Sequence, residues 1–338
     1  MQREYSYSNF NYDLDTFSQS QRNFYPKNKN KQNYLNTEID DNNLPSAPKI
    51  LNVKYNNYDK ISEEPEDKIY IEDLNNSLNY IGRPYINAND FLDDHQFYEF
   101  TCFENKKKYF AKKYYMWDFR FISEKNILKC LKHDNILPFL ISLKDENYYY
   151  ILYKKYRIIT LKEYLTQKKT LSENEVRFII IELINLLKYL RSNNIIHRNL
   201  NLDNILLTDQ GEIKVIGFDN AIQLKTSQNY IEHEISEFEF IDAPEMRYTN
   251  NDKHFNIFCK YKVNYSYEID IWALGYIMYY LLVGKAPNID YNTDMKSFAK
   301  SIPNISKRAQ DCIRRLLEPY PNKRQKLKQI LMLDFFYY

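Results

Sequence analysis

A polar stretch in the second half of the 338-residue chain carries side chains that could position a reacting hydroxyl group. His197, Arg198 and Asn199 are consecutive, and Asn201 and Asn204 follow closely. A general base needs a group that can accept a proton, such as a carboxylate, and the neutral amides of these asparagines cannot do this. These residue types therefore provide hydrogen bonds for positioning without providing a base.

Short strands and a buried helix are expected to hold this stretch. Apolar runs at 205–207 and 213–215 predict two strands joined by a turn that contains Gly211. Upstream, the capping-box pattern at 172–175 predicts the start of a helix that ends near Leu190. Because that helix is apolar on most sides, we expect it to be buried.

The first half of the chain is predicted to contain mainly strands with one helix. Aromatic and β-branched runs at 97–103, 109–114 and 148–153 predict strands, and apolar residues at helical spacing predict a helix over 122–131. Further helices are predicted from Asp270 onward and at 309–317 and 327–333.

The segment Ile196–Leu207 resembles the catalytic loop of eukaryotic protein kinases, which reads His-Arg-Asp, four residues, then Asn. The order of motifs over residues 80–338 resembles a protein kinase domain, closest in style to the Ser/Thr kinases. The resemblance implies an α+β, bilobal fold with a small β-rich N-lobe (about 80–152) and a larger helical C-lobe (about 157–338). Residues 1–67, rich in Asn, Tyr, Ser and Lys, are expected to form a disordered low-complexity tail.

The motifs that build the kinase fold are nearly all present. Glu245 closes an Ala-Pro-Glu motif, and Arg324 matches the arginine that pairs with this glutamate in kinases. Asp270 matches the aspartate that holds the catalytic-loop backbone. The resemblance also assigns structural roles to His197, Arg198, Phe218, Leu128 and Trp272.

The resemblance assigns vestigial nucleotide binding to Lys113, Glu124 and Asn204. In Ala111-Lys112-Lys113, Lys113 matches the phosphate-binding lysine of the Ala-x-Lys motif, and a register one residue earlier would give Lys112 that role. Glu124 matches the helix carboxylate that pairs with this lysine.

The groups that perform the chemistry are degenerate. Asn199 replaces the catalytic aspartate, and Asn201 replaces the lysine that contacts the transferred phosphate. Gly217 replaces the metal-binding aspartate of Asp-Phe-Gly. Asp219 is a weak substitute metal ligand, because an alignment that uses it moves Phe218 out of the hydrophobic spine. The loop at 87–92 lacks the glycines that let backbone amides approach phosphates.

These losses predict a pseudokinase, which is not an enzyme and acts on a protein partner, such as an active kinase or its substrate, by scaffolding or allosteric regulation. We expect no required cofactor and at most weak, metal-independent ATP binding. The alternative is a weakly active or atypical Ser/Thr protein kinase that transfers phosphate from ATP to protein.

The acidic residues that precede Ala-Pro-Glu suggest a partner for Arg198. A fixed carboxylate in this segment could pair with the guanidinium without phosphorylation, and a solvated acidic loop is the simpler alternative. The four glutamates are Glu232, Glu234, Glu237 and Glu239.

Composition excludes several other classes. A formal charge of +2 gives no field that favours nucleic acid, and four scattered cysteines fit neither a zinc site nor a disulfide framework. The longest apolar run, 271–283, is too short to cross a bilayer, so we expect no membrane insertion. The start of the sequence has no apolar signal-peptide core, which makes the cytoplasm the expected location.

Overall fold

The computed structural model describes residues 69–73, 78–84, 97–102, 106–145, 147–225, 231–235, 243–246 and 261–337. The chain divides into two compact units, 1–46 and 47–338, and every described residue belongs to the second. The predicted tail (1–67) and the predicted glycine-free loop (87–92) lie outside the described residues.

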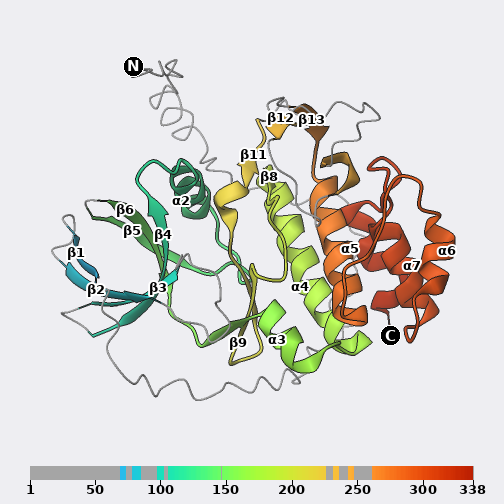
Figure 1. Cartoon of the computed structure of the whole chain (residues 1–338), viewed down its shortest axis with the longest axis horizontal. Helices are drawn as coiled ribbons and strands as arrows, with labels where there is room; N and C mark the ends of the chain where they lie inside the picture. Colours follow the sequence, from blue (N-terminus) through green and yellow to red (C-terminus); the bar gives the residue numbers. More distant parts are fainter. Residues whose placement is uncertain are drawn as a thin grey trace, which may run out of the picture. The chain divides into compact units, whose positions relative to one another are not determined.

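A six-stranded antiparallel sheet forms the N-lobe (Figure 1). Its order is β1-β2-β3-β4-β6-β5, and β1 also contacts β5, so the sheet curls around an interior. The sheet begins at Ile69, before the domain start at residue 80 that the sequence predicts. The strands are β1 (Ile69–Asp73), β2 (Leu78–Pro84), β3 (Phe97–Cys102), β4 (Lys108–Tyr115), β5 (Phe139–Lys144) and β6 (Tyr148–Lys154).

Both faces of this sheet are buried near β4. The concave interior holds an aromatic cluster that includes Tyr98, Phe100 and Tyr150. The other face packs against the helix α2 (Arg120–Cys130) and joins the main core through Phe110 and Tyr153.

The C-lobe is mainly helical. α4 contacts α5, and α5 contacts α7, as Figure 1 shows. The capping box of Ser172 and Glu175 begins α4, which is buried along most of its length as predicted. The helices are α3 (Leu161–Lys168), α4 (Glu173–Ser192), α5 (Glu268–Val283), α6 (Met295–Ser301) and α7 (Lys307–Leu316), with 3-10 helices η2 (Phe218–Asn220), η3 (Pro244–Met246), η4 (Leu327–Met332) and η5 (Asp334–Phe336).

Short strand pairs hold the predicted catalytic loop. β8 pairs with β11 just before the loop, and β9 pairs with β7 and β10 just after it. β12 pairs with β13, and β13 contacts the 3-10 helix η3 at the Ala-Pro-Glu motif. The strands are β7 (Ile158–Thr160), β8 (Ile195–Ile196), β9 (Ile205–Thr208), β10 (Ile213–Val215), β11 (Ile222–Gln223), β12 (Ile231–Ile235) and β13 (Tyr261–Tyr265).

The bilobal kinase fold predicted from the sequence is confirmed. Residues 327–333 were predicted as an α-helix, and the structure instead has the 3-10 helix η4 over most of this range. Within the described ranges, no helix combines the length and the apolarity needed to span a membrane.

A buried ion pair ties the Ala-Pro-Glu motif to the C-lobe. The guanidinium of Arg324, whose side chain is 0% exposed, donates to both carboxylate oxygens of Glu245 at 2.7 and 2.9 Å. It also donates to the backbone carbonyls of Glu268, Glu318 and Pro319. The predicted pairing of Glu245 with Arg324 is therefore confirmed.

Replacing Arg324 should destabilise the fold strongly. The Arg324→Met variant leaves the Glu245 carboxylate and three carbonyls without their donor, so the free energy of unfolding should fall by about 3–5 kcal/mol in urea denaturation. Lys162→Met, which breaks the exposed Lys162–Asp203 pair, is the control and should change stability by less than about 1 kcal/mol. Equal effects of the two variants would contradict this role for Arg324.

Candidate nucleotide site

Strand β4 points Lys112 toward α2. The Nζ atom of Lys112 lies 3.3 Å from Oε2 of Glu124, and the two side chains are 8% and 0% exposed. The predicted pairing of Glu124 with a β4 lysine is thus present, and the lysine is Lys112.

The assignment of the nucleotide lysine to Lys113 is wrong. Side chains alternate along a strand, so Lys113 points to the opposite face of the sheet. There its ammonium donates to the Tyr98 hydroxyl at 2.9 Å and lies over the rings of Tyr98 and Tyr148. Lys113 therefore belongs to the aromatic interior of the sheet and takes no part in the site.

The correct register places an aromatic side chain where the family motif has a small one. The kinase pattern has alanine two residues before the lysine, and in this chain that residue is Phe110. Phe110 is buried, and its ring centroid lies 6.3 Å from that of Tyr153. Phe110 thus adds bulk on the face of β4 that Lys112 shares.

Glu124 connects three elements of the site. Its Oε1 atom accepts hydrogen bonds from the Tyr153 hydroxyl at 3.1 Å and from the Phe218 amide at 3.2 Å, while Oε2 faces Lys112. Burial raises the pKa of the Glu124 carboxyl, and the Lys112 ammonium opposes this rise. Glu124 therefore joins β4, β6 and η2 to α2.

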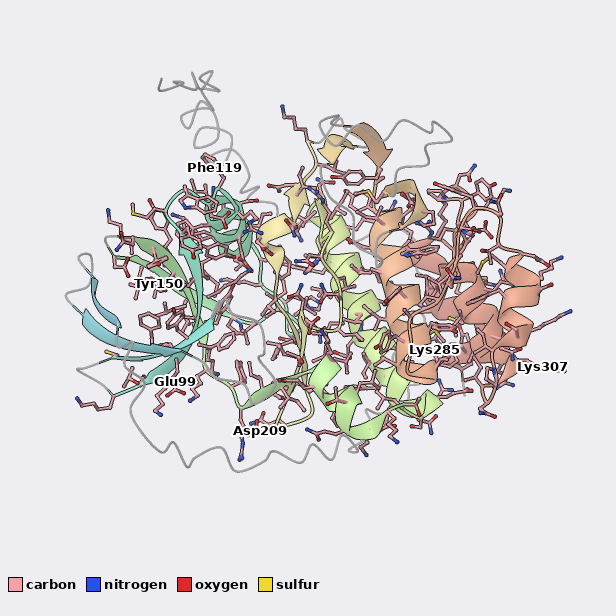
Figure 2. All side chains as sticks on the ribbon, viewed as in Figure 1. Glu99, Phe119, Tyr150, Asp209, Lys285 and Lys307 are labelled. Atoms are coloured by element: carbon pink, nitrogen blue, oxygen red, sulfur yellow. The ribbon has the colours of Figure 1, made fainter. Side chains whose placement is uncertain are left out.

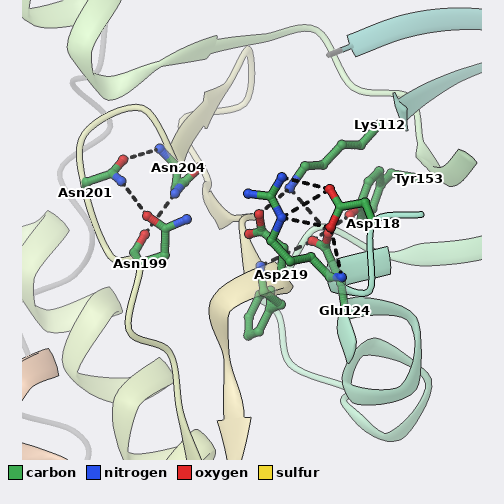
Figure 3. Close-up of polar contacts among 10 residues, drawn as sticks. Lys112, Asp118, Glu124, Tyr153, Asn199, Asn201, Asn204 and Asp219 are labelled. Carbon is green, nitrogen blue, oxygen red and sulfur yellow. Dashed lines mark hydrogen bonds and ion pairs between the residues drawn. The ribbon is translucent and has the colours of Figure 1, made fainter. Parts of the chain in front are cut away.

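Asp219 supplies a second carboxylate to Lys112. Its Oδ2 atom lies 3.3 Å from Nζ of Lys112, and its side chain is 10% exposed. Figure 3 draws these two residues together with Glu124. Phe218 nevertheless remains buried against His197, with ring centroids 4.6 Å apart. The argument that Asp219 reaches the site only when Phe218 leaves the spine is therefore wrong, because both contacts exist together.

Gly217 adopts a left-handed backbone conformation with φ of +84°. A Cβ atom at this position would lie 2.6 Å from Cγ and Nδ2 of Asn204, which is closer than non-bonded atoms allow. The Asn204 amide thus occupies the space next to Gly217 that a larger side chain would need.

Three asparagines bond to one another in the catalytic loop (Figure 3). Nδ2 of Asn201 donates to Oδ1 of Asn199 at 2.9 Å, and Nδ2 of Asn204 donates to the Asn199 backbone carbonyl at 2.8 Å. The Oδ1 atom of Asn201 accepts from the backbone amide of Asn204 at 3.0 Å. These neutral side chains stabilise the loop, and none of them is a base.

Asp270 fixes the start of this loop, as predicted. Its carboxylate accepts from the backbone amides of His197 at 2.8 Å and Arg198 at 2.9 Å. Burial raises the pKa of Asp270 to about 6 and lowers that of the His197 imidazole to about 4. Arg198 has a φ of +66°, and its guanidinium carbon lies 5.4 Å from the ring centroid of Tyr265.

The acidic side chains predicted to pair with Arg198 lie outside the described part of the chain. Glu232 and Glu234 fall in β12, of which only the backbone is described, and Glu237 and Glu239 belong to the range 236–242. The contact with Tyr265 is thus the side-chain environment that the structure gives for Arg198.

The residues of the site do not fit the magnesium-bound nucleotide that the fold implies. At the metal-binding position, Gly217 has no side chain, and Asn204 fills the adjoining space. The carboxylate of Asp219 faces the Lys112 ammonium through Oδ2, while its buried Oδ1 atom has no hydrogen-bond partner among the described residues. Among the described residues, no cluster of three or more His, Cys, Asp or Glu side chains could hold a metal ion.

Comparison with known proteins defines the class. Residues 102–336 match the family described as "Protein kinase domain", and the chain belongs to this family. It is 33% identical over 255 residues to the "Probable serine/threonine-protein kinase CCRP1" of Zea mays, covering 70% of this chain and 38% of that protein. It is also 31% identical over 226 residues to the "Cell cycle serine/threonine-protein kinase CDC5/MSD2" of Saccharomyces cerevisiae, covering 64% of this chain and 30% of that protein.

A further relative is the "Serine/threonine-protein kinase polo" of Drosophila melanogaster, 29% identical over 218 residues, which are 63% of this chain and 35% of that protein. The chain therefore spans less than two fifths of the length of these curated relatives. What it shares with them is the kinase domain.

Exchanging the two β4 lysines for methionine should separate their roles. Lys112→Met leaves the buried Glu124 carboxylate without its cation, so the free energy of unfolding should fall by about 3–5 kcal/mol. Lys113→Met removes a hydrogen bond and ring contacts at a half-buried position and should cost about 1 kcal/mol. Urea denaturation of both variants measures the difference, and a larger loss for Lys113→Met would contradict the register.

A second pair of variants tests the contact between Gly217 and Asn204. Gly217→Ala combines left-handed strain with a clash, whereas Gly211→Ala, at φ of +80° with no heavy atom within 4 Å of the added Cβ, has the strain alone. Both variants should lose about 1–2 kcal/mol from strain, and Gly217→Ala should lose about 1–3 kcal/mol more. Equal losses in urea denaturation would show that Asn204 does not fill this space.

Proposed function

We propose that this chain is a catalytically impaired protein kinase domain, a pseudokinase, that acts by binding a protein partner. The observation that carries the proposal is the contact of Lys112 with Asp219. The pair that this lysine forms with Glu124 is also found in active kinases and does not distinguish the two functions. In an active kinase the equivalent lysine contacts the phosphates of the nucleotide. Here a nucleotide would have to displace Asp219 from Lys112 first.

The charges around Lys112 oppose phosphate binding. Unlike charges near 3 Å attract strongly in a buried site, so Glu124 and Asp219 together more than balance the single ammonium. A triphosphate would bring further negative charge next to Asp219, without a metal ligand at Gly217. We therefore infer at most weak, metal-independent ATP binding and no required cofactor.

The neutral catalytic loop supports the same proposal. Loss of a general base commonly lowers the rate of a reaction by a factor of about 10²–10⁴. Asn199 has a neutral amide at this position and cannot act as the base. Asn201 bonds to Asn199 instead of presenting a cation. Both side chains contribute to the stability of the loop, which is a role that persists without chemistry.

The intact fold gives such a module a defined surface. Asp270, Arg324 and Glu245 keep the contacts that order the C-lobe, although the groups for phosphoryl transfer are replaced. We propose that the module binds a protein partner, such as an active kinase or its substrate, and acts on it by scaffolding or by allosteric regulation. Neither nucleic-acid binding nor membrane insertion is part of this proposal, and we expect the protein to act in the cytoplasm.

A weakly active or atypical Ser/Thr kinase is the alternative function. Relatives named as serine/threonine-protein kinases favour it, as does the carboxylate of Asp219 beside Lys112. In this alternative, Asp219 would take the role of the metal-binding aspartate that other kinases have at the position of Gly217.

Phosphotransfer and thermal denaturation distinguish the two functions. Purified full-length protein should transfer no phosphate from radiolabelled ATP to a protein substrate, and its melting temperature should not rise with ATP and magnesium, because a ligand stabilises only a fold that binds it. The alternative predicts a magnesium-dependent rise and transfer that Asp219→Asn and Lys112→Met both abolish. Transfer that survives in both variants would indicate a contaminating kinase.

A further inference from the structure

An exposed apolar patch lies where β4 leads into α2. Five large side chains form this β4–α2 patch, and Trp117 and Phe119 are its most exposed members at 72% and 83%. Figure 2 shows Phe119 at the outer edge of the N-lobe, beside α2. The members are Tyr115, Met116, Trp117, Phe119 and Ile122.

The backbone and rings of this patch are held in place. The Met116 amide donates to the Asn147 carbonyl at 3.2 Å, and the Asp118 amide donates to the Tyr115 carbonyl at 2.9 Å. The Tyr115 ring stacks on Trp117 with centroids 5.3 Å apart and also contacts Tyr148 at 5.3 Å. An apolar surface that is already ordered loses little entropy when a partner binds it.

Within residues 115–132 the exposed charges are positive. The turn between β5 and β6 beside the patch adds Asp145, whose carboxylate accepts from the Tyr150 hydroxyl and from the amides of Asn147 and Tyr148. The two acids between Tyr115 and Lys132 are withdrawn from solvent: Asp118 is 9% exposed and paired with Arg120, and Glu124 is 0% exposed. On and after α2, Lys129 and Lys132 are exposed and Lys125 is half-buried. Ile122 lies at helical spacing with Lys125 and Lys129, so apolar and basic side chains share one side of α2.

We propose that the β4–α2 patch is a docking surface for a protein segment that alternates acidic with aromatic or aliphatic side chains. The apolar side chains of the segment would cover Trp117 and Phe119, and its carboxylates would face Lys125 and Lys129. The inference rests on the proposed function, since it names the surface through which the pseudokinase binds its partner.

The geometry favours a protein segment over an anionic membrane surface. Helices that lie in a membrane interface carry apolar side chains along one whole face. In α2 the apolar stripe ends at Ile122, and half-buried Ser123 and Asn126 follow. The apolar part is therefore short, as a pocket for a few anchor residues would be.

Trp117 makes the proposal measurable, because the chain has two tryptophans and Trp272 is only 1% exposed. The probe is a synthetic peptide that alternates Glu or Asp with Phe and Leu, and the control peptide has Lys at every acidic position. With the full-length protein, the acidic peptide should shift Trp117 emission to shorter wavelength and protect it from acrylamide quenching. The binding should weaken as salt is added.

Variants give the sharper test, with affinity measured by calorimetry. Trp117→Ala and the double variant Lys125→Glu/Lys129→Glu should each lower the affinity for the acidic peptide at least about tenfold, which is ~1.4 kcal/mol. Met332→Ala, at an exposed apolar residue in η4, is the control and should bind normally.

No binding of the acidic peptide, or equal binding of the lysine peptide, would overturn the proposal. A shift of Trp117 emission with phosphatidylserine vesicles but not with the acidic peptide would overturn it in favour of a membrane surface. None of these readouts depends on ATP, so failure of the docking surface and failure of the pseudokinase assignment are distinguished.

Discussion

The ion cluster of Lys112, Glu124 and Asp219 is the interaction on which the site depends. It joins β4, α2 and η2 with three side chains that are each at least nine-tenths buried. One ammonium between two carboxylates satisfies charges that would otherwise be costly to bury. Under the proposed function, these contacts within the chain take the place of the contacts that a nucleotide would make with the lysine.

Other features of the site follow from this cluster. Glu124 also accepts the Phe218 amide, which keeps Phe218 against His197 and so connects α2 to the catalytic loop. Asp270 holds the same start of that loop through the backbone amides of His197 and Arg198. These residues connect the N-lobe to the C-lobe. The β4–α2 patch precedes α2, the helix that carries Glu124, and includes one residue of it, Ile122.

The sequence predicted much of this arrangement because the fold-defining contacts involve residue types that appear in a fixed order. Asp270, Glu245 and Arg324 were identified from their motifs, and each makes the contact expected of it. The register of β4 could not be predicted. Strand alternation reveals the inward face only when one face is polar, and around Lys112 both faces of the sheet are buried.

The contact of Asp219 with Lys112 could not be predicted from the sequence either. The kinase motif Asp-Phe-Gly has its acid first, whereas Gly217-Phe218-Asp219 has it last. The sequence alignment therefore suggested that Asp219 could take the place of the acid only if Phe218 left the hydrophobic spine. The left-handed Gly217 and the 3-10 turn after it let Phe218 and Asp219 point to different partners. The loop at 115–119 is rich in aromatic residues, which is visible in the sequence. In a chain with 33 tyrosines and 20 phenylalanines, however, an aromatic run does not indicate whether its side chains are buried or exposed.

The central claim is that Asp219 takes the place of a nucleotide at Lys112. Calorimetric titration of the full-length protein with ATP and magnesium, alongside the Asp219→Ala variant, tests it most directly. The account predicts no magnesium-dependent binding to the unmodified protein, because Lys112 is already neutralised and Gly217 holds no metal. Magnesium-dependent binding to the unmodified protein that disappears in Asp219→Ala would contradict the account and make Asp219 a ligand of the nucleotide complex.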